Sequence, residues 1–173
     1  ALNVYLQDPS AVYGAFNFGW NPALGAKTPF RDKRLRQAFA LSIDRELYLD
    51  AIYDLKKLQG QGYPIKGYLH TAVQSDTGGD IWLDPTGKDF GPNAKYYKQD
   101  VAEAKKLVAA AGFNGETEMI LPARQSVRNV AYYDGLEAIY GMTQESGVFK
   151  FKLTYIANYD ADWVINYHNQ AKQ

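Results

Sequence analysis

Residues 29–46 read PFRDKRLRQAFALSIDRE, and this stretch carries the clearest local signals in the chain. Asp32 precedes a run with Leu35, Ala38 and Phe39 on one helical face, and its carboxylate can accept free backbone N–H groups of a first turn. Asp44 repeats the arrangement for a second helix. The apolar stripe expected for that second helix consists of Leu47, Ala51, Ile52 and Leu55. We therefore expect two capped helices that meet with a bend at Asp44.

The segments on either side add strands and further helices. Upstream, alternating apolar residues predict two strands, within 2–6 and 12–20, joined by a turn. Downstream, Asp100 to Gly112 has the pattern of a helix with an N-terminal capping box and a closing glycine. The expected elements that follow are a strand over 118–121, a helix from Ser126 to about Glu145, a strand over 149–155 and a helix from about Asp160.

The strand–helix–strand order over 118–156 favours a parallel pair with a right-handed crossover. The predicted fold class is therefore α/β, a mixed sheet with packed helices, and we expect 1–173 to form a single domain. Residues 59–99 hold seven of the fifteen glycines and three of the seven prolines. They are predicted to form a long, mostly irregular excursion, of the kind that is usually functional or docked on other parts of a protein.

Composition excludes several classes of function. Nineteen Lys and Arg balance nineteen Asp and Glu, which argues against a nucleic-acid partner. The sequence has no cysteine and only two histidines, so neither disulfides nor a His-rich metal centre is expected. It also lacks a phosphate loop, a dinucleotide fingerprint and a nucleophile elbow. We expect no cofactor, no metal and no enzymatic activity.

The motifs at 29–46 resemble the signature of family 5 extracellular solute-binding proteins, the oligopeptide- and dipeptide-binding components of ABC importers. The matching residues are Pro29 to Ala38 and Ala40 to Glu46. Phe16-Asn17 is similar to the strand that precedes this motif in the family. Tyr97, followed by the helix from Ala102 to Gly112 and its Ala-Gly-aromatic end at Phe113, is a second match. These motifs are caps, stripes and a closing glycine, so they report fold rather than ligand.

The resemblance implies one lobe of a two-lobed, type II periplasmic-binding-protein-like fold that closes on its ligand. The chain resembles the second lobe, so we expect it to hold part of a site, with the first lobe of the same protein supplying the rest. Expected partners are a peptide or small-molecule ligand and ABC permease subunits. The implied location is periplasmic or extracellular, with lipid anchoring to the membrane surface as an open alternative.

Ligands of such lobes sit near strand ends and helix N-termini. The loop from Pro122 to Asn129 fits this description, and Arg124 and Arg128 are candidates to bind a ligand carboxylate, beside the N–H groups of the helix predicted at Ser126. The alternative is that both arginines are solvated surface residues. The chain is rich in aromatic residues, which suit binding surfaces as well as cores. The aromatic and histidine candidates for ligand contact are Trp20, Tyr68, His70 and Trp82. Trp82 is equally well explained as an anchor for its own loop.

Two other functions stay open at this point. A carbohydrate-acting hydrolase could use carboxylates of the Tyr- and Trp-rich region, since sequence does not reveal which carboxylates pair in space. A sensory or interaction lobe without transport would use the same fold. Peptide is the expected ligand class, although family membership does not fix the ligand.

Overall fold

The structure is a computed structural model that describes residues 18, 29–67, 69, 71, 79–122 and 130–158. The chain divides into two compact units. Among the described residues, one unit comprises 44–67 and 79–98 together with 69 and 71, and the other comprises 29–43, 99–122 and 130–158 together with 18. The strands expected within 2–6 and 12–20, the N-terminus of the helix expected at Ser126 and the last helix lie outside the described residues.

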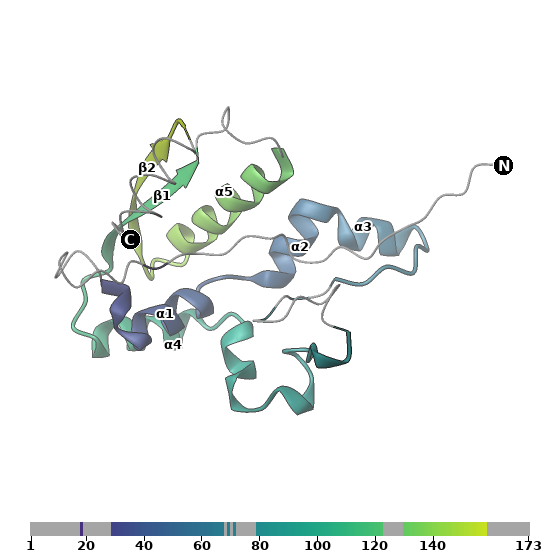
Figure 1. Cartoon of the computed structure of the whole chain (residues 1–173), viewed down its shortest axis with the longest axis horizontal. Coiled ribbons are helices and arrows are strands. Elements are labelled where there is room, and N and C mark those ends of the chain that lie inside the picture. The colour runs from purple at the N-terminus through teal and green to yellow at the C-terminus, as the bar shows by residue number, and fades with distance from the viewer. Residues whose placement is uncertain are drawn as a thin grey trace. The chain divides into compact units, whose positions relative to one another are not determined.

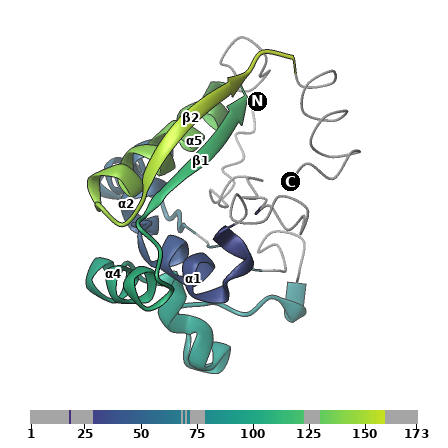
Figure 2. The same ribbon diagram turned by 90° about the vertical axis from the view of Figure 1, so that its left-hand side faces the viewer.

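The larger unit begins with a 3-10 helix, Pro29–Arg31, followed by α1, Lys33–Leu41. The Asp32 carboxylate accepts a hydrogen bond from the backbone N–H of Arg34 at 2.8 Å, which confirms the predicted N-cap. The side chains that α1 buries include Leu35, Ala38 and Phe39, as the spacing indicates. Figures 1 and 2 show α1 lying beside α4, Val101–Ala110.

Helix α4 has both of its predicted ends. The Asp100 carboxylate accepts from the backbone N–H of Glu103 at 2.9 Å. At the other end, Gly112 has a φ of 67°, the left-handed conformation that a residue without a Cβ adopts at little cost. The N–H of Phe113 bonds to the carbonyl of Val108 and that of Gly112 to Ala109, which is the Schellman arrangement of a helix C-terminus.

The sheet of the larger unit pairs β1, Glu116–Pro122, with β2, Lys150–Ile156. The two strands are parallel, with Glu116 opposite Lys150 and Leu121 opposite Tyr155. They are connected through α5, Val130–Glu145, which lies alongside both strands in Figures 1 and 2. The mixed α/β class and the parallel pair are therefore confirmed.

The core of this unit is a cluster of phenylalanines that joins residues far apart in sequence. The Phe149 side chain is 1% exposed and lies 5.6 Å from the Phe30 ring and 6.1 Å from the Phe39 ring, measured between centroids. Phe151 stacks on Phe149 at 5.3 Å, and Phe18 lies 4.8 Å from Phe30. The 29–46 stretch is thus held to β2 by aromatic packing, which contributes beyond simple area burial.

The smaller unit contains α2, Arg45–Tyr53, and α3, Leu55–Gly60. Asp44 caps α2 by accepting from the backbone N–H of Leu47 at 2.9 Å, as expected. The predicted apolar stripe of α2 is wrong, however. Leu47 is 50% exposed, Ala51 is exposed, and Ile52 and Leu55 are only half-buried. The side chains that α2 buries are Tyr48 and Leu49, because packing partners rather than spacing decide which face turns inward.

Asp54 separates α2 from α3 and has a φ of 51°, so the chain turns there through the left-handed region. The stretch predicted as an irregular excursion, 59–99, contains short 3-10 helices at Gly79–Ile81, Lys88–Phe90 and Pro92–Tyr97. Among its described residues it contributes no strand to a sheet. Its assignment as a loop within a single domain stays a prediction.

Candidate functional site at the carboxyl ends of the strands

Five of the six residues predicted to bind ligand lie outside the described residues, namely Trp20, Tyr68, His70, Arg124 and Arg128. The sixth, Trp82, is half-buried, and its indole Nε1 donates a hydrogen bond to the carbonyl of Leu69 at 3.2 Å. This bond joins two points of the excursion that lie thirteen residues apart. It gives Trp82 a loop-anchoring contact, while its ligand role stays a prediction.

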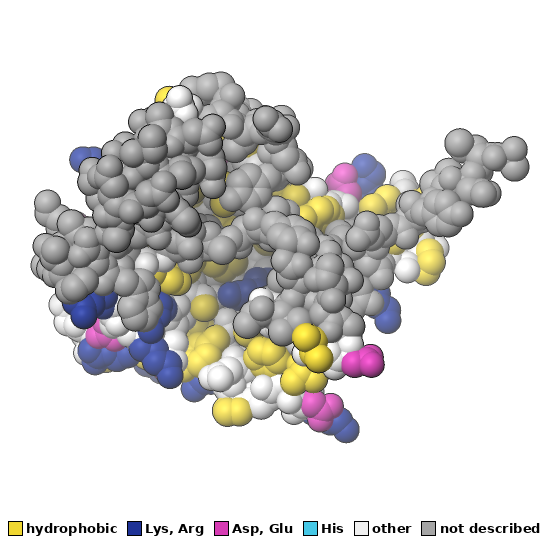
Figure 3. All heavy atoms as spheres, viewed as in Figure 1, with side chains coloured by type: hydrophobic (Ala, Val, Ile, Leu, Met, Phe, Trp, Pro, Cys, Tyr) yellow, Lys and Arg dark blue, Asp and Glu magenta, His cyan; other side chains and the backbone are white. Residues whose placement is uncertain are grey.

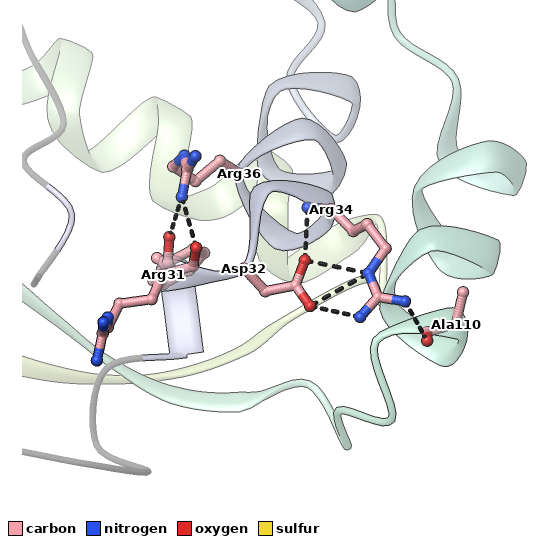
Figure 4. A network of polar contacts seen from close by, with 6 residues as sticks. Arg31, Asp32, Arg34, Arg36 and Ala110 are labelled. Atoms are coloured by element: carbon pink, nitrogen blue, oxygen red, sulfur yellow. Dashed lines mark hydrogen bonds and ion pairs between the residues drawn. The ribbon is translucent and has the colours of Figure 1, made fainter. Parts of the chain in front are cut away.

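The family-like motif at 29–46 forms a structural network. Figure 4 shows the Asp32 carboxylate held by the Arg34 guanidinium, with Nη2 to Oδ2 at 2.6 Å, while Arg34 Nη1 donates to the Ala110 carbonyl at 2.6 Å. Arg36 Nη1 donates to the carbonyls of Phe30 and Arg31. The Arg34 bond fastens the start of α1 to the end of α4, whereas the Arg36 bonds fasten α1 to the preceding 3-10 helix.

The charges of this network stay largely at the surface. The hydrogen bonds from the Arg34 side chain and backbone lower the pKa of the Asp32 carboxyl from its ordinary value. In Figure 3, Lys and Arg side chains gather over the part of the molecule where Figure 1 shows α1 and α4. Because the network holds α1 to α4 through Arg34, its residues have a structural role, which is why the motif indicates the fold.

A different polar cluster lies where the parallel strands end. Tyr133, near the start of α5, donates its hydroxyl to Glu137 Oε1 at 2.6 Å. Tyr155, one residue before the end of β2, donates to the same oxygen at 3.0 Å. We call Tyr133, Glu137 and Tyr155 the tyrosine–glutamate cluster.

The backbone positions each member of this cluster. Tyr133 and Glu137 are four residues apart on α5, so they lie one above the other on one helix face. Tyr155 comes to the same place because β2 runs parallel to β1 and its carboxyl end lies beside Leu121. Near the far end of α5, the Gln144 Oε1 accepts from the backbone N–H of Phe151 at 3.0 Å, which fixes helix against strand.

The electrostatics of the cluster follow from these hydrogen bonds. Donation to the Glu137 carboxylate, together with burial, raises the pKa of the Tyr133 hydroxyl well above its usual range. Burial, followed by the bond to Glu137, raises the pKa of Tyr155 as well. Both phenols are therefore neutral hydrogen-bond donors at physiological pH.

The arrangement, a carboxylate held by two neutral phenols, suits recognition of a polar group. Within the described ranges, no group of three or more His, Cys, Asp or Glu side chains lies close enough together to hold a metal ion. The carboxyl ends of parallel strands are the usual place for ligands in α/β sheets. Residues 123–129, which lie outside the described residues, follow β1 in sequence.

Family comparison identifies the chain. The family model for bacterial extracellular solute-binding proteins, family 5 Middle, matches residues 2–168. The chain belongs to this family. Comparison with curated proteins and with solved structures gave no match.

Membership of this family places the chain among proteins that bind solutes for ABC transport, a non-enzymatic class that works outside the cytoplasm. The resemblance noted in the sequence is confirmed. In the portion of the chain that the structure describes, no helix combines the length and the apolar character needed to cross a bilayer.

Sequence reasoning missed the role of Glu137. By alternation along 150–156, Tyr155 shares a strand face with Phe151 and Leu153, yet Tyr155 is 48% exposed. The spacing of Tyr133 and Glu137 was a usable signal for a helical hydrogen bond. Nothing local pointed to Tyr155, because its contact with Glu137 spans eighteen residues.

Proposed function

We propose that this chain binds a peptide for uptake through an ABC transporter, as part of a site that closes between two lobes. The family match over 2–168 is the observation that carries this proposal, because it covers nearly the whole chain. In such a protein no bond is made or broken. Closure is a hinge motion driven by contacts that the ligand makes only in the closed state.

The loop that follows β1 is the proposed contact for the peptide carboxylate. Arg124 and Arg128 belong to the loop predicted from the sequence, and a guanidinium can hold a carboxylate through two parallel hydrogen bonds. The support for this proposal is that β1 ends at Pro122, so the residues of the predicted loop follow the carboxyl end of that strand in sequence. Trp20, Tyr68, His70 and Trp82 are proposed as further ligand contacts.

Isothermal titration calorimetry tests the carboxylate contact with a tripeptide and its C-terminal amide. We expect the double variant Arg124→Ala/Arg128→Ala to weaken tripeptide binding by about ten- to hundredfold, the range for hydrogen bonds between charged groups. It should also lose the preference for the free carboxylate. Lys105→Ala/Lys106→Ala is the matched control, because it removes two exposed cations from α4. Equal binding by both double variants would contradict the role of the arginines.

Two further measurements separate transport from the alternatives. Peptides or glycans incubated with the protein should be recovered unchanged by mass spectrometry, whereas a hydrolase would shorten them. Peptide uptake into vesicles that carry the permease and ATPase subunits should depend on the added protein. Binding without any stimulation of uptake would favour a sensory lobe.

The proposed location is periplasmic or extracellular, with the protein either free or lipid-anchored at the membrane surface. Fractionation of cells with and without detergent distinguishes the two forms. A lipid-anchored protein would be released only by detergent.

A further inference from the structure

The hydrogen bonds of the tyrosine–glutamate cluster use one of the two oxygens of the Glu137 carboxylate. Tyr133 and Tyr155 both donate to Oε1 of Glu137. A carboxylate group can accept about four hydrogen bonds across its two oxygens. Among the described residues, none donates to Oε2 of Glu137.

On the described part of α5, the helix that supplies Tyr133 and Glu137, the charge is negative. Helix α5 carries Asp134, Glu137 and Glu145 and no Lys or Arg. The nearest basic residues on β2, Lys150 and Lys152, alternate with Tyr155 and therefore belong to the opposite face of the sheet. On that opposite face, Glu118 of β1 accepts from the Thr154 hydroxyl.

The cluster is open to a ligand from one side. Tyr133 is 6% exposed and forms the inner wall, whereas Tyr155 is 48% exposed. Glu137 is half-buried, so its exposure lies between those of Tyr133 and Tyr155. A carboxylate beside two aromatic rings offers a cation both charge pairing and the negative face of a tyrosine ring.

We propose that Tyr133, Glu137 and Tyr155 form a subsite for an alkylammonium group of the bound solute, an inference that rests on the proposed solute-binding function. The ammonium donates to Glu137 Oε2 and packs against Tyr155, while the two phenols hold Oε1 and fix the carboxylate in place. One carboxylate is too few ligands for a divalent cation, which takes six or more oxygens. The ammonium comes either from the amino terminus of a peptide or from a lysyl side chain.

A purely structural role predicts something different. If the cluster only fastened α5 to β2, its loss would lower stability and leave ligand discrimination unchanged. Glu137→Gln separates the two roles, because glutamine keeps an oxygen that accepts from both phenols and removes the charge. Glu145→Gln is the matched control, since it removes the same charge from the other end of α5 at an exposed position.

The experiment compares three peptides by isothermal titration calorimetry. Trialanine carries an amino-terminal ammonium, N-acetyl-trialanine carries none, and N-acetyl-Ala-Lys-Ala carries only a side-chain ammonium. We expect the wild-type protein and Glu145→Gln to prefer one of the two ammonium-bearing peptides over N-acetyl-trialanine by about tenfold or more. Glu137→Gln should lose most of that preference, and the preferred peptide identifies the source of the ammonium.

Equal discrimination by Glu137→Gln and Glu145→Gln would overturn the proposal. If none of the peptides binds the wild-type protein, the peptide function fails, and n-butylammonium then tests the subsite on its own. It should shift the aromatic NMR signals of Tyr133 and Tyr155 in the wild-type protein and in Glu145→Gln, but not in Glu137→Gln, whereas n-butanol should shift none. In that case, absence of a shift in the wild-type protein would overturn the subsite as well.

Discussion

Replacing Asp32 with alanine is expected to lower the free energy of unfolding by about 1–2 kcal/mol. The side-chain cap, formed with the Arg34 backbone N–H at 2.8 Å, contributes about 1 kcal/mol. The ion pair with the Arg34 guanidinium adds less than the cap, because both side chains are partly exposed, at 30% for Asp32 and 46% for Arg34. Arg34 also loses the partner that orients it toward the Ala110 carbonyl.

Asp32→Asn separates these contributions. Asparagine caps a helix about as well as aspartate, so this variant keeps the cap and loses the ion pair. We expect it to lose at most about half of what Asp32→Ala loses. Urea unfolding followed by circular dichroism gives both values, and an unchanged slope against denaturant shows that only stability has moved. Because a cap is a short-range hydrogen bond, most of the stability that Asp32→Ala loses should still be lost at high salt.

Two results would refute this reasoning. If Asp32→Asn is as destabilised as Asp32→Ala, the ion pair and not the cap stabilises the start of α1. If Asp32→Ala loses less than about 0.5 kcal/mol, the cap does not hold the helix. The pH dependence of the free energy of unfolding gives a further check on the contribution of Asp32. Since the pKa of Asp32 is lowered in the folded protein, its contribution is present above the ordinary value of 3.8 and is lost as the pH falls through the lower, folded-state pKa.

Three further predictions concern the core, the end of α4 and the tyrosine–glutamate cluster. Phe149→Ala should cost about 3–5 kcal/mol in urea unfolding, because the side chain is 1% exposed among other phenylalanine rings, and Phe149→Leu should cost clearly less. Gly112→Ala should lower the free energy of unfolding by about 1–2 kcal/mol through its φ of 67° alone, since an added Cβ there meets no other atom within 4 Å. As the control, Gly141→Ala inside α5 should be neutral or stabilising by up to about 1 kcal/mol. Equal effects of the two substitutions would contradict the backbone argument. The raised pKa of Tyr133 favours the protonated phenol in the folded state, so its contribution to stability is fully present below the ordinary pKa of 10.0 and falls as the pH rises above that value. Tyr133→Phe should flatten this decline in unfolding experiments at alkaline pH. An unchanged decline would exclude Tyr133 as its source.

The sequence supports good predictions where the interaction is local. Asp32, Asp44 and Asp100 cap helices as expected, because each carboxylate reaches a backbone N–H two or three residues away. Gly112 adopts a positive φ angle as the residue that closes α4, for the same reason. The strand–helix–strand order also suffices to predict a parallel pair.

Burial was harder to predict. On α2, spacing favoured the face with Leu47, yet Tyr48 and Leu49 are the side chains that the unit buries. A nine-residue helix with several apolar positions has more than one possible inner face. Contacts from other segments decide which face is chosen, and single-sequence periodicity does not contain them.

The candidate site shows the same difference between what the sequence order indicates and what contacts between distant segments decide. Residues near the end of β1 were predicted as ligand contacts from topology, and Arg124 and Arg128 stay predictions because they lie outside the described residues. Glu137 was missed because its importance depends on two partners, one of them on another element. A carboxylate on a helix surface looks ordinary in sequence until the fold brings Tyr155 to it.

The amino-acid sequence by itself determined the family and the local helices with their caps, since the 29–46 stretch contains its own capping and apolar residues. Only the tertiary structure decided that this stretch packs through Phe30 and Phe39 against Phe149, and that the two strand ends gather two phenols on one carboxylate. The physical reason is the range of the interactions. Hydrogen bonds of caps close within a few residues, whereas aromatic packing and the tyrosine–glutamate cluster exist only after chain segments distant in sequence have met.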